Sequence, residues 1–353
     1  MAPIPFVGPF PPPVHGQAVA TATIAALLEQ RGLPLQRLDT GEAGAGGPWR
    51  GRIRRVHGVL RAAMACLRPG SRTAYLSVSA NAGMVLTALL AGLARLGRKR
   101  PVLHHHTYAH VTARGAGMAL LARLAGPSAI HMTICPAMSR ELAATYPEIC
   151  ETTAFSNVDA VDRALLDIPR SRNLPRTLGF LSNLTLEKGV ERAIAAFRLA
   201  HAHGLADSLV LAGPCRDIGA RAAIDAAGME FGDRLHYLGP VSGTAKLNFF
   251  ASIDLFLFPS LYRNETQGIV NLEALAAGLP VIAYGLCCIP GDLDDPACTV
   301  LEPGQPFDTA VTAFLQDLAP RYPAACQGAR ARFHTLARAH EAEINHLAAI
   351  LAL

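Results

Sequence analysis

The 353-residue sequence has few charged side chains and no recognisable cysteine spacing. Charged residues make up 17% of the chain and hydrophobic residues 51%, a composition that excludes an intrinsically disordered protein. The eight cysteines form no C-x-x-C pair, which argues against a zinc site and against a secreted disulfide framework. A reduced, cytoplasmic location is therefore expected.

Long apolar runs are also missing. The longest clean run extends from Ala82 to Ala94, and it is shorter than the ~20 residues that a membrane-spanning helix needs. It predicts a buried helix. The proline-rich N-terminus lacks the charged start of a signal peptide.

Acidic residues are scarce in the first part of the chain. Residues 1–150 hold 16 Lys and Arg but only 5 Asp and Glu, so the remaining 16 basic and 22 acidic residues give the rest a net negative charge. The basic excess is sharpest at Trp49–Arg61 and Arg95–Arg100. A basic amphipathic segment suits an anionic membrane surface, although a solvated helix face explains it equally well. Nucleic acid is not expected as a partner, because few aromatic residues accompany these charges.

Apolar runs of strand length alternate with helical patterns, which predicts parallel α/β sheets. The strand candidates are Ile4–Val7, Ala74–Val78, Val102–His106, Ile130–Ile134 and Thr152–Ser156, then Thr177–Leu181, Leu209–Ala212, Leu235–Leu238, Leu255–Phe258 and Val281–Ala283. No G-x-G-x-x-G follows the first strand, which leaves a dinucleotide-dependent dehydrogenase poorly supported.

The length suggests two domains rather than one. The two prolines and mixed charge of Leu165–Pro175 are typical of a linker. We therefore expect one domain at residues 1–165 and a second at residues 166–332. The apolar spacing from Phe333 onward predicts a final helix over 333–353.

Two carboxylates flank a glycine in the most informative block of the sequence. Residues 259–283 read PSLYRNETQGIVNLEALAAGLPVIA, with Glu265 in a loop after an apolar strand and Glu273 on the following helix. Gly268 lets a ligand approach the backbone where that helix begins. The free N–H groups of the helix start favour a phosphate, so the two acids are placed to hold the hydroxyls of a sugar and of a ribose.

This block resembles the E-x7-E region of retaining family 4 glycosyltransferases (group 1) with the GT-B fold. The resemblance rests on the Pro-Ser strand end, both acids, the glycine between them and the run EALAAGLPV. It implies two Rossmann-like domains that face a central cleft. The N-terminal domain receives the acceptor, the C-terminal domain binds the nucleotide-sugar donor, and the last helix returns toward the N-terminal domain.

The resemblance also assigns roles to single residues. Glu265 would bind the transferred sugar and Glu273 the ribose, and Lys188 in LSNLTLEKGV would contact the diphosphate. The family often has an arginine five residues before that lysine, where this chain has Asn183. The remaining donor-binding positions implied by the match are Gly16 after three prolines, Thr266, Gln267, Gly268, Ile269 and Val270.

Three adjacent histidines, His104 to His106, end one predicted strand. Neighbours on a strand point to opposite faces, so the three cannot all bind one metal ion. The resemblance places His106 near the sugar and the acceptor. Asp292–Asp295 imitates a D-x-D metal motif, but that motif belongs to a different glycosyltransferase fold, and we interpret it as a solvated turn. No metal and no cofactor beyond the donor substrate is expected.

The resemblance implies a retaining, metal-independent hexosyltransferase of bacterial polysaccharide or cell-envelope glycan synthesis. It would use a nucleotide-diphosphate sugar and a glycan, lipid-linked or small acceptor, in the cytoplasm or peripherally at the inner membrane face. Two alternatives stay open: a nucleotide-sugar epimerase of the same fold, and a non-catalytic protein that only binds nucleotide sugar. The residues do not distinguish uracil, guanine and adenine nucleotides.

Overall fold

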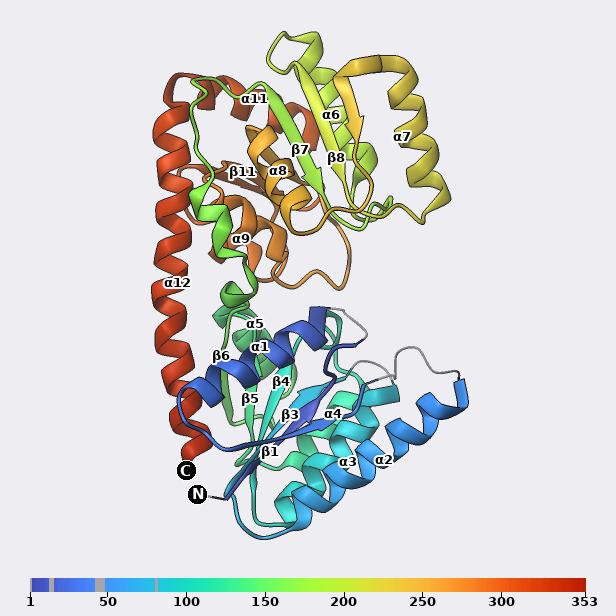
Figure 1. Cartoon of the computed structure of the whole chain (residues 1–353), viewed down its shortest axis with the longest axis vertical. Helices are drawn as coiled ribbons and strands as arrows, with labels where there is room; N and C mark the ends of the chain where they lie inside the picture. The colour runs from blue at the N-terminus through green and yellow to red at the C-terminus, as the bar shows by residue number, and fades with distance from the viewer. Residues whose placement is uncertain (1, 13–15, 42–47, 80–81) are drawn as a thin grey trace. The chain divides into compact units, whose positions relative to one another are not determined.

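The chain folds into two α/β units (Figure 1). The computed structural model describes residues 2–12, 16–41, 48–79 and 82–353. The N-terminal unit comprises Met1–Ala160 and Arg338–Leu353, and the C-terminal unit comprises Val161–Ala337. The chain therefore passes between the units twice, after Ala160 and after Ala337.

Strands and helices alternate along the N-terminal unit. The strands are β1 (Ile4–Gly8), β2 (Leu35–Asp39), β3 (Thr73–Val78), β4 (Arg100–His105), β5 (Ile130–Thr133) and β6 (Glu151–Ala154). The helices are α1 (Gly16–Gln30), α2 (Pro48–Leu67), α3 (Ala82–Leu96), α4 (Ala116–Ala125) and α5 (Pro136–Thr145). The sheet has the order β2-β1-β3-β4-β5-β6, and every pair is parallel.

Helices cover both faces of this sheet. Helix α1 and the end of α12 (Tyr322–Ala352) lie on one face, and α2, α3 and α4 pack side by side on the other (Figure 1). The core under α1 includes Phe6 and Tyr75, whose rings stack with centroids 3.9 Å apart. Ile344 and Leu347 of α12 join the same cluster, so the last helix is part of this hydrophobic core.

A buried histidine fixes the end of α12 to the N-terminal unit. His340 forms ion pairs with Asp159, at 3.1 Å, and with Glu343, at 2.7 Å, and its ring packs edge-on against Phe155. Burial opposes protonation, but the two carboxylates outweigh it and raise the pKa of His340 to about 9. Asp159 lies just before the first boundary between the units, after Ala160, and His340 lies just after the second, after Ala337. The charged His340 therefore joins the two chain segments that connect the units.

The ion pairs of His340 predict a loss of stability at alkaline pH. The folded pKa of about 9 lies above the ordinary 6.5, so the stabilisation is complete below about pH 6.5 and disappears as the pH rises through 9. Its size is up to about 3 kcal/mol. Denaturant unfolding should show this slope for the wild type and not for His340→Gln. His346→Gln, on the same helix, should behave as the wild type; an unchanged pH slope in His340→Gln would contradict the assignment.

The C-terminal unit has the same alternation. Its strands are β7 (Thr177–Leu181), β8 (Ser208–Ala212), β9 (Leu235–Tyr237), β10 (Leu255–Phe258), β11 (Val281–Tyr284) and β12 (Cys298–Leu301). Its helices are α6 (Val190–Ala202), α7 (Ile218–Phe231), α8 (Thr244–Ser252), α9 (Ile269–Ala276), α10 (Ile289–Asp292) and α11 (Phe307–Leu318), followed by the first part of α12. The order is β12-β11-β10-β7-β8-β9, again all parallel.

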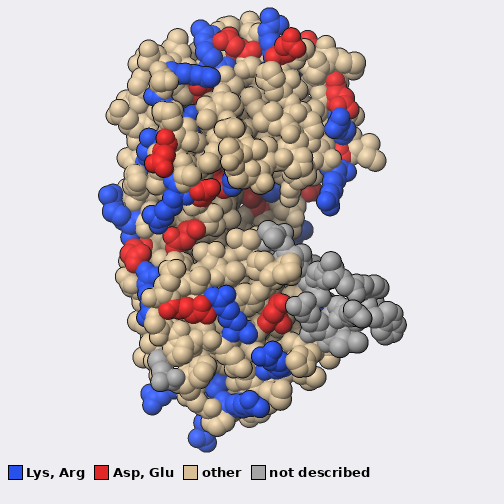
Figure 2. Space-filling model, viewed as in Figure 1, with Lys and Arg blue, Asp and Glu red and all other residues tan. Residues whose placement is uncertain are grey.

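The order of this second sheet reverses between β7 and β10. The chain moves outward from β7 to β8 and β9, then returns to place β10 on the other side of β7. Loops that follow β7 and β10 therefore diverge to opposite faces, and a ligand-binding crevice forms at such a point in open α/β sheets. Positive and negative side chains are interspersed over the visible face of this unit (Figure 2).

Several sequence-based expectations require correction. The apolar run from Ala82 is a helix with one buried face, but Val85 and Leu89 on its other face are exposed, so the helix is only partly buried. Asp292 is buried at the end of α10, and the supposed solvated turn is therefore wrong at that residue. Strands β2 and β12 were not predicted; both are edge strands and only partly buried. No helix in the described residues is long and apolar enough to cross a membrane.

Candidate functional site

A lysine and a glutamate meet at the reversal point of the C-terminal sheet. Lys188 follows β7, Glu265 follows β10, and Lys188 Nζ lies 2.5 Å from Glu265 Oε2. Both side chains are largely buried, with 17% and 10% exposed. Because the carboxyl ends of parallel strands share one edge of a sheet, residues 77 positions apart become ion-pair partners.

The surroundings hold this pair in place. The Ser260 hydroxyl donates to Glu265 Oε2 at 2.9 Å, and Lys188 Nζ lies 4.4 Å from the centroid of the Tyr262 ring. Gly189, next to the lysine, has φ +91°, and a Cβ there would lie 2.3 Å from the Pro259 carbonyl oxygen. Only glycine permits this close approach of the two loops. The ion pair thus sits in a preformed polar environment.

Gly268 precedes helix α9 and adopts a left-handed conformation, with φ +62° and ψ +70°. A side chain at this position would be strained and would contact Phe258. The amides at the start of α9 form the positive end of the helix dipole. Glu265, the partner of Lys188, comes only three residues before Gly268. The ion pair and the start of α9 therefore belong to the same loop.

The second acid of the motif has its own lysine. Glu273 on α9 is buried and forms an ion pair with Lys246 of α8. Burial raises the pKa of Glu273, and Lys246 opposes that shift. The carboxylate is held on the core side of a short helix, which restricts the directions from which a ribose could reach it.

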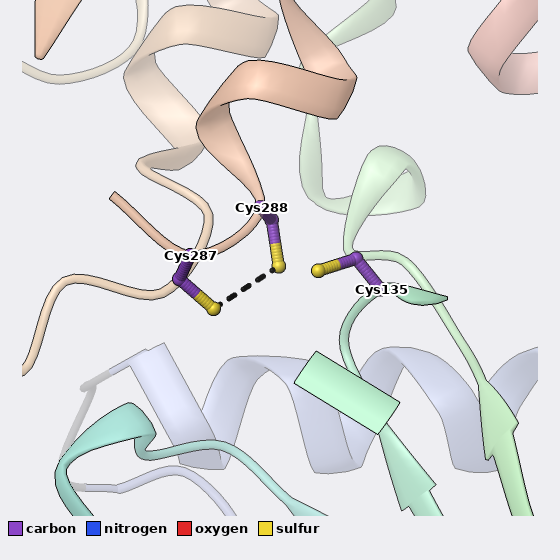
Figure 3. A group of neighbouring side chains, drawn as sticks. All are labelled: Cys135, Cys287 and Cys288. Atoms are coloured by element: carbon purple, nitrogen blue, oxygen red, sulfur yellow. Dashed lines mark hydrogen bonds between the residues drawn. The ribbon is translucent and has the colours of Figure 1, made fainter. Parts of the chain in front are cut away.

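The remaining donor-side positions lie on the same loops. Thr266 and Gln267 are buried, whereas Asn183, after β7, is exposed. The amide of Cys288 donates to the Thr266 carbonyl at 3.0 Å, so the loop after β11 supports the loop that carries Glu265. Cys287 and Cys288 lie on this supporting loop with sulfurs 3.6 Å apart (Figure 3).

Gly16 and His106 belong to the N-terminal unit. Gly16 is exposed and is the first residue of α1. Gln17 beside it donates to the Ser77 hydroxyl at 2.8 Å and to the Val78 carbonyl at 3.1 Å. These contacts fix the start of α1 to the end of β3, next to the point where the first sheet reverses its order.

Histidines occupy both faces of β4, as side-chain alternation predicted. The rings of His104 and His106 lie on one face with centroids 3.9 Å apart. His105, on the other face, has its two nitrogens 3.1 Å from His110 Nε2 and 3.0 Å from His131 Nδ1. Neutral imidazoles carry one donor and one acceptor each, so these three form a continuous hydrogen-bonded row.

Burial keeps these histidines neutral. It lowers the pKa of His106 to about 3, with a further contribution from His110, and lowers the pKa values of His110 and His131 to about 4. The rings can therefore accept and orient hydroxyl groups at neutral pH without carrying charge.

This cluster predicts acid sensitivity of the N-terminal unit. The folded pKa values lie below the ordinary 6.5, so stability is complete above about pH 6.5 and falls as the pH drops toward 4. His110→Gln should flatten the acid slope of the unfolding free energy by about 1 kcal/mol per pH unit. The control is His57→Gln, an exposed histidine. Identical acid slopes in wild type and His110→Gln would count against the buried neutral state.

Sequence reasoning missed three parts of the site. Lys246 and Ser260 became visible only when the sheet brought distant loops together. The contact between His105 and His131 depends on the register of β4 against β5, in which Leu103 is opposite His131. The presence of a histidine in each of two neighbouring predicted strands is the one signal that was available beforehand.

Comparisons with known proteins agree on one family. Residues 175–317 match the family model of glycosyl transferases group 1. An alpha-monoglucosyldiacylglycerol synthase of Streptococcus pneumoniae is 26% identical over 219 residues, which cover 53% of this chain and 47% of that protein. An uncharacterised glycosyltransferase of Methanocaldococcus jannaschii is 33% identical over 114 residues, 29% of this chain and 25% of its own length. The chain thus spans about half or less of these curated relatives.

Solved structures share the fold over almost the whole chain. A sucrose-phosphate synthase from Thermosynechococcus elongatus superposes with a TM-score of 0.71 at 16% identity, covering 98% of each chain. HepE from Anabaena, solved with UDP-glucose, gives a TM-score of 0.65 at 17% identity and covers 99% of this chain and 98% of its own. The two α/β units therefore form a GT-B fold.

Proposed function

We propose that this chain, whose residues 175–317 match the family model of glycosyl transferases group 1, transfers a sugar from a nucleotide-diphosphate sugar to an acceptor hydroxyl with retention of configuration. The observation that carries the proposal is the Lys188–Glu265 ion pair at the sheet reversal. It combines a cation for a diphosphate with a carboxylate for sugar hydroxyls, at the place where α/β sheets bind ligands.

The donor would compete with Glu265 for Lys188. In the structure each of the two charges neutralises the other. An incoming diphosphate would take over the ammonium group, with the amides around Gly268, Ile269 and Val270 as further donors. Glu265 would then be released to bind the sugar, supported by Ser260. Glu273 would accept hydrogen bonds from the ribose, and Lys246 opposes the rise in its pKa that burial causes.

A uridine nucleotide is the first donor to test. HepE was solved in complex with UDP and with UDP-glucose, and its fold covers nearly all of this chain. Asn183, Thr266 and Gln267 are the remaining side chains that we assign to the donor, and Gly16 contributes a backbone amide of the N-terminal unit.

The transfer step needs no enzymatic nucleophile in this proposal. The bond between the anomeric carbon and the phosphate oxygen breaks, and its electron pair leaves with the diphosphate. The acceptor oxygen forms the new bond on the same face, and its proton passes to the departing phosphate. Lys188 and the helix amides stabilise the charge that develops there, and neutral His106 orients the sugar or the acceptor. No step is assigned to a metal ion.

A lipid or lipid-linked acceptor of cell-envelope glycan synthesis fits best. One relative is named as an alpha-monoglucosyldiacylglycerol synthase. The basic N-terminal part of this chain suits an anionic surface. We therefore place the protein peripherally at the cytoplasmic face of a membrane, with the N-terminal unit on the acceptor side.

The donor site predicts a defined mutational pattern. Turnover should appear with one member of a panel of UDP-, GDP- and ADP-sugars. Lys188→Ala and Glu265→Ala should each lower kcat/KM by roughly 10²- to 10³-fold, because each removes a charge that the transition state requires. Glu187→Ala, an exposed neighbour in the same loop, should remain close to the wild type.

Product analysis by NMR separates the possible outcomes. A new glycosidic bond with the donor's anomeric configuration supports the proposal, and an inverted configuration contradicts retention. An epimerised nucleotide sugar formed without acceptor would show that the protein is an epimerase and not a transferase. Wild-type turnover in both Lys188→Ala and Glu265→Ala would overturn the site.

A further inference from the structure

Helix α2 exposes a stripe of apolar side chains. Val56, Leu60, Met64 and Leu67 are between 41% and 59% exposed. Their spacing of three and four residues puts them on one face of the helix. The opposite face includes Ala62 and Cys66, which are fully buried. The helix therefore packs on its own unit through the opposite face, and the stripe stays exposed to solvent.

The neighbouring helices continue the stripe. On α3, Val85 and Leu89 are 44% and 53% exposed and Leu96 is 74% exposed, and Leu120 on α4 is 36% exposed. The three helices pack side by side (Figure 1). These eight side chains, on α2, α3 and α4, are called the three-helix face.

Close packing makes this face a rigid surface. Gly97, just after α3, approaches the end of α2 so closely that a Cβ there would lie 2.2 Å from the Cys66 carbonyl oxygen. On the other side of α3, a Cβ at Gly92 would lie 3.7 Å from the Leu124 Cβ of α4. Exposed apolar patches of this kind on a folded protein mark interaction sites.

The charged side chains of the three helices themselves have a single sign. Residues 43–140, a stretch of 98, hold 14 Lys and Arg and no Asp or Glu. The exposed cations on or beside the three helices are Arg55, Arg61, Arg68, Arg95, Arg98 and Arg123. The helices supply no carboxylate of their own, so the partner that complements this surface is apolar and negatively charged.

We propose that the three-helix face docks on a bilayer that contains anionic lipid. The leucines, valines and methionine would enter the boundary between headgroups and acyl chains, and the arginines would keep their guanidinium groups among the lipid phosphates. This docking rests on the peripheral membrane location in the proposed function, but it does not depend on the donor chemistry. It identifies which surface of the N-terminal unit contacts the lipid.

A protein partner is the competing occupant. Protein interfaces of this apolar character commonly have mixed charge at their rim, whereas α2, α3 and α4 carry basic residues and no acidic ones. The helices lie along the surface, and none in the described residues can span a membrane. An interfacial, reversible attachment is the mode of membrane contact that remains for this face.

Vesicle flotation of the full chain tests the proposal. The wild type should float with vesicles of mixed phosphatidylcholine and phosphatidylglycerol, float poorly with phosphatidylcholine alone, and be released by high salt. The double variant Leu60→Gln/Leu89→Gln should bind anionic vesicles at least about tenfold more weakly. Arg68→Gln should weaken binding about fivefold, which corresponds to about 1 kcal/mol per basic residue near an anionic surface.

Matched controls come from the C-terminal unit. Ile218→Gln/Met229→Gln removes two apolar side chains of α7 that are 88% and 85% exposed, and Arg216→Gln removes an exposed cation; both should float as the wild type. Unchanged melting temperatures would show that the face variants remain folded. Equal flotation of face and control variants would overturn the proposal, as would self-association through this face without lipid binding. Lys188→Ala should float normally, so a failed donor site and a failed docking face give different results.

Discussion

The reversal of strand order between β7 and β10 is the constraint on which the donor-side geometry depends. All strands of the sheet are parallel, so every connecting loop at one edge follows a strand end. In open α/β sheets, ligands bind at the carboxyl ends of the strands where the order reverses. Lys188 and Glu265 lie on the loops that follow β7 and β10, and they form an ion pair there. Gly189 and Gly268 allow the backbone to turn sharply beside each of them.

The two units handle charge differently. In the C-terminal unit, the two acids of the motif are paired with lysines: Glu265 with Lys188, and Glu273 with Lys246. Such pairs cost desolvation energy but hold groups ready for a charged ligand. In the N-terminal unit, the row of His105, His110 and His131 avoids that cost by staying neutral. His340 of the same unit differs: two carboxylates keep it charged where both connections between the units come together.

The sequence predicted the parallel α/β architecture because apolar strands and helical patterns alternate clearly. Buried central strands such as β7 and β10 were placed at their observed limits. The edge strands β2 and β12 were missed because partial burial leaves no apolar run. Helix α3 was expected to be buried because composition alone cannot show which side of an apolar helix remains uncovered.

For the site, the motif identified Glu265, Glu273 and Lys188 as candidates, and their roles remain proposals. The sequence could not show that Lys188 and Glu265 form an ion pair, because that contact depends on the order of the strands rather than on local spacing. The same is true of Lys246 and of the row of imidazoles. Long-range pairing was the information that the pattern lacked.

A crystal structure of the protein with a bound, non-hydrolysable UDP-sugar analogue is the most direct test of the central claim. We predict that Lys188 Nζ leaves Glu265 and lies within hydrogen-bond distance of a phosphate oxygen. The Glu265 carboxylate would then contact hydroxyls of the sugar, and Glu273 those of the ribose. A donor bound elsewhere, with the Lys188–Glu265 pair still intact, would contradict the account.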